Sequence, residues 1–156
     1  MIAPKNAVPR DAEGRYRVMV VDDSAVIRGF FRRALESDPT IEVVASVGNG
    51  QSAIDSLRRT GVDVVVLDIE MPVMDGMTAL PQLLAVDPSL RVIMASTLTV
   101  ANAEISLRAL ARGAADYIPK PMSTREVTTS LDFRRELIEK IRQLGQRAFR
   151  VHMATA

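Results

Sequence analysis

The chain has 156 residues, 47% of them hydrophobic and 25% charged, which is the composition of an ordinary soluble domain able to bury a sizeable core. Its 20 basic and 19 acidic residues nearly cancel, so the overall charge gives no reason to expect nucleic acid or a membrane surface as a partner. The absence of Cys excludes disulfides and thiolate metal sites, and no apolar run approaches the ~18 residues of a transmembrane helix, so we expect a cytoplasmic protein.

Short β-branched runs predict five strands, which follow a leader, residues 1–15, that we expect to be flexible. The runs 18–21 and 64–67 are continuously apolar, as expected of strands buried on both faces of a sheet. The predicted strands are 17–21, 41–47, 63–67, 91–95 and 115–118.

Amphipathic stretches between these runs predict helices. Asp23 or Ser24 is a suitable N-cap for the first helix, because a short polar side chain there can accept a backbone N–H. The apolar residues of this helix recur with helical spacing on one face: Ile27, Phe30, Phe31, Ala34 and Leu35. The other helices are predicted at 51–59, 77–86, 101–112 and about 131–149, the last following a polar connector, 123–130, and preceding a tail, 150–156.

Pro81 falls inside the third predicted helix. Proline is harmless in the first turn of a helix but costs about 3 kcal/mol deeper in, because its N–H is missing and its ring clashes with the preceding turn. We therefore expect this helix either to start late, near Thr78, or to be kinked.

Five strands alternating with five helices predict an α/β fold: a doubly wound, five-stranded parallel sheet covered by helices on both faces. In such sheets ligands bind outside the carboxyl ends of the strands. The residues that follow each apolar run are therefore the candidates for a functional site.

Charged and hydroxyl side chains follow four of the five runs. Asp22 and Asp23 end the first run, Asp68 the third, and Ser96 with Thr97 the fourth, while Lys120 follows the fifth. Three carboxylates within a few ångströms repel one another unless a hard cation lies among them. Oxygen-only ligands suit Mg²⁺, or Mn²⁺ in its place.

Carboxylates, Mg²⁺ and a lysine together are suited to phosphoryl transfer, which depends on positioning and charge neutralisation. The only His is His152, in the tail, so a Ser–His–Asp triad is excluded, and no Gly-rich nucleotide-binding motif occurs. The phosphoryl acceptor is then a carboxylate acting as nucleophile, and Asp68 on the central run is the natural choice.

Three segments resemble the receiver domains of two-component response regulators: VVDDS at 20–24, LDIEMPVMDG at 67–76 and AADYIPKP at 114–121. The resemblance covers residue 17 to about 147. It implies a flavodoxin-like strand order 2-1-3-4-5 for a receiver domain at 16–149, and a histidine kinase that phosphorylates Asp68.

The same resemblance implies roles for the other candidates. Asp22, Asp23 and Asp68 would hold Mg²⁺ together with the backbone carbonyl of Glu70. Ser96 would swing towards the phosphoryl group, with Thr97 as the competing hydroxyl, and Lys120 would stand at the lysine position of the family.

Two further roles also come from the resemblance. Tyr117 would follow the movement of the hydroxyl, and the face of the fourth helix, fifth strand and fifth helix would change for a partner. The Lys120–Pro121 bond matches a cis peptide of the family.

A narrower likeness joins DIEMPVMDG, MASTLT at 94–99, LRALARGAADYIPKP and FRRELIEKI to the regulatory half of chemotaxis methylesterases. Those proteins carry a hydrolase domain after the receiver, whereas this sequence stops at residue 156. We expect either an excised regulatory domain of such an esterase or a stand-alone receiver that acts on a separate partner.

Two other interpretations have less support in the sequence. An aspartyl-nucleophile Mg²⁺ phosphatase would place a D-x-D pair on the first strand, where this chain has Asp22-Asp23. A degenerate receiver that only binds partners would lack an essential Asp or Lys, and none is lacking here.

Overall fold

The structure is a computed structural model, which describes residues 14–97, 99–120 and 131–155. Its strands are β1 (Tyr16–Val21), β2 (Ile41–Val47), β3 (Val64–Asp68), β4 (Arg91–Ser96) and β5 (Asp116–Pro119). Its helices are α1 (Ala25–Glu36), α2 (Gly50–Arg59), α3 (Gly76–Val86), α4 (Val100–Ala111) and α6 (Leu131–Thr155).

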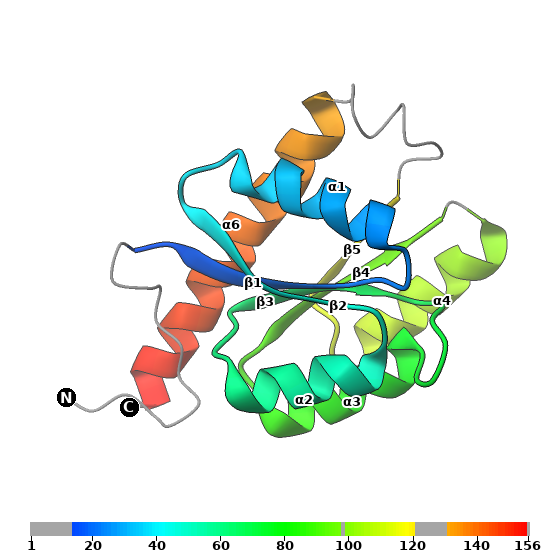
Figure 1. The fold of residues 1–156 in the computed structure, drawn as a ribbon. Coiled ribbons are helices and arrows are strands. Elements are labelled where there is room, and N and C mark those ends of the chain that lie inside the picture. The colour runs from blue at the N-terminus through cyan, green and yellow to red at the C-terminus, as the bar shows by residue number, and fades with distance from the viewer. Residues whose placement is uncertain (1–13, 98, 121–130, 156) are drawn as a thin grey trace.

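The strands form one parallel sheet in the order β2-β1-β3-β4-β5, which confirms the predicted flavodoxin-like topology. Figure 1 shows α1 and α6 on one face of this sheet and α2, α3 and α4 on the other. The fold is therefore the three-layer, doubly wound arrangement expected from alternating strands and helices.

Successive residues of β1 point to opposite faces of the sheet and build two separate cores. Val18 and Val20 pack in the core beneath α1 and α6, whereas Met19 and Val21 pack in the core beneath α2, α3 and α4. All four side chains are buried, which explains why this run is continuously apolar rather than alternating.

Each helix that follows one of the first four strands begins with a polar cap. The side chains of Ser24, Asn49, Asp75 and Thr99 accept the backbone N–H three residues further on, in α1, α2, α3 and α4 respectively. Ser24 rather than Asp23 is therefore the cap of the first helix, which leaves the Asp23 carboxylate available to the site.

The predicted late start of the third helix is wrong, because α3 already begins at Gly76. The Asp75 side chain accepts the N–H of Thr78, and the Ala79 N–H donates to the Asp75 carbonyl at 3.0 Å. This cap fixes the first turn, and the helix continues through Pro81. The alternative of a kink at Pro81 stays a prediction.

The last helix extends to Thr155, past the end that we predicted near Phe149 and through most of the segment taken as a tail. No Pro or Gly follows Phe149, so the sequence contains nothing that would stop the helix.

In the part of the chain that the structure describes, no helix combines the length and apolarity required to cross a membrane. The predicted connector 123–130, the bond to Pro121 and most of the leader lie outside the described residues.

Candidate functional site

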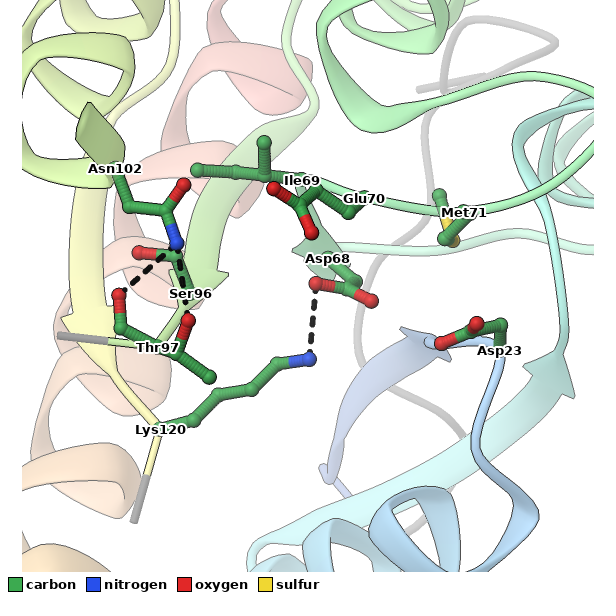
Figure 2. Close-up of a pocket in the computed structure, with 9 residues that line it drawn as sticks. All are labelled: Asp23, Asp68, Ile69, Glu70, Met71, Ser96, Thr97, Asn102 and Lys120. Atoms are coloured by element: carbon green, nitrogen blue, oxygen red, sulfur yellow. Dashed lines mark hydrogen bonds and ion pairs between the residues drawn. The ribbon is translucent and has the colours of Figure 1, made fainter. Parts of the chain in front are cut away.

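The carboxyl ends of β3, β4 and β5 border a cleft of about 450 Å³, which we call the strand-end cleft. Asp23, which follows β1, lies across this cleft from Ser96 and Thr97 (Figure 2). The residues that line the cleft are Asp23, Asp68, Ile69, Glu70, Met71, Ser96, Thr97, Asn102 and Lys120.

Three carboxylates meet at this edge of the sheet. Asp22, Asp23 and Asp68 each offer an oxygen, and these oxygens lie within 4.8 Å of one another. Asp22 and Asp68 are buried and Asp23 is exposed, so the trio opens to solvent on the Asp23 side. The Asp22 side chain is held in place because its Oδ1 accepts the N–H of Ser24 at 2.9 Å.

Lys120 places its ammonium among these carboxylates. Its Nζ lies 2.5 Å from Asp22 Oδ2 and 2.9 Å from Asp68 Oδ1 (Figure 2 shows the pair with Asp68). The backbone N–H of Lys120 donates to the Ser96 carbonyl at 2.7 Å, which fixes the start of the side chain against β4. One ammonium therefore faces two buried carboxylates, which leaves the cluster with a net negative charge.

This arrangement shifts the protonation of both partners. Burial raises the pKa of Asp68 from its ordinary value to about 6; the hydrogen bond and charge of Lys120 lower this pKa, and the charges of Asp22 and Asp23 raise it. Burial alone would lower the pKa of Lys120, but its hydrogen bonds to Asp22 and Asp68 outweigh burial and raise it above its ordinary value. Lys120 is therefore a fixed positive charge at neutral pH.

The donor set fits a hard divalent cation. The three carboxylates offer only oxygen, they converge on one point, and a single lysine leaves their repulsion partly uncompensated. Mg²⁺ and Mn²⁺ prefer such ligands, and the open side of the cluster leaves room for water or a phosphoryl oxygen. Glu70 lines the same cleft and so lies within this neighbourhood.

The loop after Asp68 packs tightly back on the strand end. A β-carbon on Gly76 would collide with the Asp68 carbonyl oxygen, so only glycine fits at this position. Val73, in the same loop, has a φ of +68°, and the Met74 N–H donates to the Pro72 carbonyl at 2.7 Å. These contacts form a γ-turn with a left-handed central residue, a strained conformation for a β-branched side chain.

The two candidate hydroxyls differ in their surroundings. Ser96 is buried at the end of β4, whereas Thr97 is exposed and its Oγ1 accepts a hydrogen bond from Asn102 Nδ2 at 3.0 Å. Both line the strand-end cleft. Tyr117 lies on β5 with 45% of its surface exposed and is not among the residues that line the cleft.

Asn102 lines the site but was not among the residues predicted from the sequence. This residue is 6% exposed, lies in the first turn of α4 and borders the strand-end cleft. The sequence signal for Asn102 is the Thr cap three residues before it. An N-cap residue and a polar residue three positions later often form hydrogen bonds to each other's backbone at the start of a helix.

The sequence model of the family described as the response regulator receiver domain matches residues 18–132 of this chain. Among curated proteins, the chain is 63% identical over 142 residues to the protein-glutamate methylesterase/protein-glutamine glutaminase of the group 2 operon of Rhodospirillum centenum. It is 62% identical over 139 residues to the corresponding protein of Azospirillum brasilense. These alignments cover 91% and 89% of this chain but only 36% and 35% of the relatives, so the chain spans about a third of their length.

Solved structures show the same likeness. The response regulator domain of Thermotoga maritima CheB is 40% identical, with a TM-score of 0.72, and the match covers 85% of this chain and 97% of that one. A chain of the CheX–CheY–BeF₃–Mg²⁺ complex of Borrelia burgdorferi is 26% identical, with a TM-score of 0.70 and coverages of 85% and 91%.

Proposed function

The chain belongs to the response regulator receiver family, and from this premise we propose that it is a phosphorylation-dependent signalling switch whose phosphoacceptor is Asp68. The observation that carries the proposal is the position of Asp68: it is buried at the end of β3, paired with an ammonium and surrounded by two further carboxylates. The donor is a histidine kinase, as family membership implies. The domain is regulatory and catalyses only its own phosphoryl transfer in the cytoplasm.

The cation of the proposed reaction is Mg²⁺, with Mn²⁺ as a substitute. Asp22, Asp23 and Asp68 would hold it, together with the backbone carbonyl of Glu70. The bound cation supplies positive charge that offsets the negative oxygens of the phosphoryl group.

In the proposed transfer, a carboxylate oxygen of Asp68 forms a bond to phosphorus while the bond between phosphorus and the imidazole nitrogen of the donor breaks. The electron pair of the broken bond stays on that nitrogen. The pKa of about 6 applies to the metal-free site, where most of Asp68 is already ionised at pH 7, and a bound cation would favour the ionised form further. Lys120, already 2.9 Å from Asp68, neutralises the oxygens that arrive with the phosphoryl group.

Phosphorylation replaces one negative charge on Asp68 by roughly −1.5 to −2 and adds strong hydrogen-bond acceptors. We propose that Ser96 moves towards these oxygens and that Tyr117 follows into the space that Ser96 leaves. The surface formed by α4, β5 and α6 then changes for a partner. The burial of Ser96 beside the cleft and the half-exposed position of Tyr117 support this sequence of movements.

The proposed output is a protein-glutamate methylesterase domain of the kind that the curated relatives' names describe, so the pathway would be chemotactic adaptation. A stand-alone receiver acting on a separate partner is the alternative. The test is to add the methylesterase domain of the Rhodospirillum centenum relative as a separate chain and measure its activity with and without phosphorylation of the receiver. A change in activity supports methylesterase output, and no change favours the alternative.

The phosphoacceptor is tested by incubating the protein with acetyl phosphate and Mg²⁺ and counting phosphoryl groups by intact mass. We expect one group per chain in the wild type and none in Asp68→Asn. The matched control is Asp55→Asn, which removes an exposed carboxylate on α2 and should be labelled like the wild type. Label that persists in Asp68→Asn would overturn the assignment.

A further inference from the structure

The start of α4 is tied to the end of β4 by one side chain. Asn102 Nδ2 donates to the Thr97 carbonyl at 3.1 Å and to Thr97 Oγ1 at 3.0 Å, as Figure 2 shows. The backbone N–H of Asn102 also donates to Thr99 Oγ1 at 3.0 Å. An amide nitrogen carries two hydrogens, so the two bonds to Thr97 form together.

The hydrogen-bond partners of Asn102 given above are Thr97 and Thr99, and both lie on the short segment between β4 and α4. In the part of the chain that the structure describes, the Asn102 amide makes no hydrogen bond to β3 or β5. A side chain that acted as a latch, stabilising the unphosphorylated state, would bond the moving segment to an element that stays in place. These bonds instead join the strand end to the helix start, so a displacement of the strand end would act on the helix start.

The packing of α4 leaves this helix easy to move. Its buried positions are Asn102, Ser106 and Ala109, which are small or polar, and its larger apolar residues Ile105 and Leu110 are only partly buried against the core. By contrast, α6 buries Leu137, Ile141 and Leu144 against the sheet. Because hydrophobic stabilisation follows buried apolar area, α4 is held to the sheet less firmly than α6.

Thr97 directly follows Ser96, the residue that the proposed function moves towards the phosphoryl group. We propose that Asn102 is a positioning residue that couples this movement to α4, by carrying the displacement of Ser96 and Thr97 into the first turn of the helix. The inference rests on the proposed function. It adds a connection through α4 that is separate from the movement of Tyr117.

The test compares Asn102→Ala with the wild type before and after phosphorylation by acetyl phosphate and Mg²⁺. Intact mass measures the number of phosphoryl groups per chain. Amide hydrogen exchange followed by mass spectrometry measures the change in exchange rate of residues 100–111 on phosphorylation. Comparing samples at equal phosphoryl occupancy, we expect in Asn102→Ala a phosphorylation-induced change in exchange at α4 that is at least about fivefold smaller than in the wild type, since two hydrogen bonds are lost.

A second pair of variants keeps the test independent of any folding defect in Asn102→Ala. Thr97→Val removes only the hydroxyl acceptor and should reduce the α4 response in part, whereas Thr97→Ser keeps that acceptor and should restore it. Asn49→Ala is the control for loss of an Asn hydrogen bond at a helix start, because it removes the cap of α2 and should leave the α4 response intact.

The outcomes separate this inference from the proposed function. A wild type that takes no label would overturn the proposed function, and the coupling with it. Labelled variants with an undiminished α4 response would overturn the coupling alone. So would an α4 that already shows the phosphorylated exchange pattern in unlabelled Asn102→Ala, because Asn102 would then be a latch. Loss of label in both Asn102→Ala and Thr97→Val would also overturn it, because Asn102 and Thr97 would then act on the transfer itself.

Discussion

Lys120 reaches across the end of β4 from β5 to place its ammonium 2.9 Å from Asp68 Oδ1 on β3. The position depends on a backbone hydrogen bond between Lys120 and Ser96, so the strand that carries the hydroxyl also fixes the lysine. Displacement of any one of these three residues should therefore change the position of the other two.

Replacing Lys120 with Met should raise the pKa of Asp68 further above about 6, because Lys120 supplies the hydrogen bond and the charge that lower it. Phosphoryl transfer from acetyl phosphate should slow by about 10²-fold or more, as is typical when a group that stabilises developing charge is lost. Carboxyl ¹³C NMR titration measures the pKa, and single-turnover labelling measures the rate. Lys140→Met, which breaks a 2.7 Å ion pair with Asp116 instead, is the control and should change neither quantity.

The raised pKa of Asp68 makes stability depend on pH. Folded Asp68 titrates near 6 and the unfolded residue near 3.8, so the folded state binds more protons between these values. The free energy of unfolding should therefore fall as pH rises from about 4 to about 7 in metal-free buffer. Asp68→Asn cannot ionise and should exceed the wild type in stability at pH 7 by roughly 1–3 kcal/mol, with the difference disappearing near pH 4. Urea unfolding at several pH values checks this, and a wild type as stable as Asp68→Asn at pH 7 would contradict it.

Mg²⁺ should relieve the repulsion among the three carboxylates and so stabilise the fold. At a hundredfold excess over the dissociation constant, the expected gain is about 2.7 kcal/mol. Asp23→Asn removes the exposed carboxylate of the proposed cation site and should weaken binding by at least about tenfold, because that charge would act directly on a divalent cation. Isothermal calorimetry measures the affinity and thermal unfolding measures the gain. Asp55→Asn should bind Mg²⁺ like the wild type, and equal affinity in Asp23→Asn would remove that residue from the site.

Replacing Val73 with Gly should stabilise the protein. Val73 is 84% exposed, so little packing is lost, and its φ of +68° costs a β-branched residue about 1–2 kcal/mol. Glycine adopts this conformation without strain, although its greater freedom in the unfolded chain offsets about 0.5–1 kcal/mol. We expect a net gain of about 0.5–1 kcal/mol in urea unfolding.

The control for Val73→Gly is Val26→Gly. Val26 is also exposed, at 59%, but it lies in α1, where glycine should cost about 1 kcal/mol. Equal losses in the two variants would show that the Val73 backbone is unstrained.

Much of the site followed from one rule applied to the sequence. Because the strands are short apolar runs in a parallel sheet, the residues after each run share one edge, and this rule alone predicts that Asp22, Asp23, Asp68 and Lys120 lie together. Their roles in phosphoryl transfer stay predictions. The geometry shows only that the three carboxylates lie close together, that Lys120 pairs with two of them, and that their oxygens suit a cation.

Other features depend on contacts that no local pattern contains. The Gly76 N–H donates to the Ile69 carbonyl at 2.8 Å, and this contact across the loop, together with the Asp75 cap, places the start of α3 ahead of the start expected from Pro81. The side-chain bonds of Asn102 to Thr97 depend on the turn between β4 and α4. The left-handed backbone of Val73 goes against the preference of its own side chain and is set by the loop around it.

The four capped helix starts all lie at the same edge of the sheet as the aspartates, because α1 to α4 each leave the carboxyl end of a strand. Peptide dipoles in a helix add to roughly half a positive charge at its N-terminus. The edge that presents three carboxylates thus also receives positive potential from the backbone, and this contribution does not depend on any single side chain. Substitution of Lys120 should therefore remove only part of the positive potential at this edge, since the helix N-termini still contribute theirs.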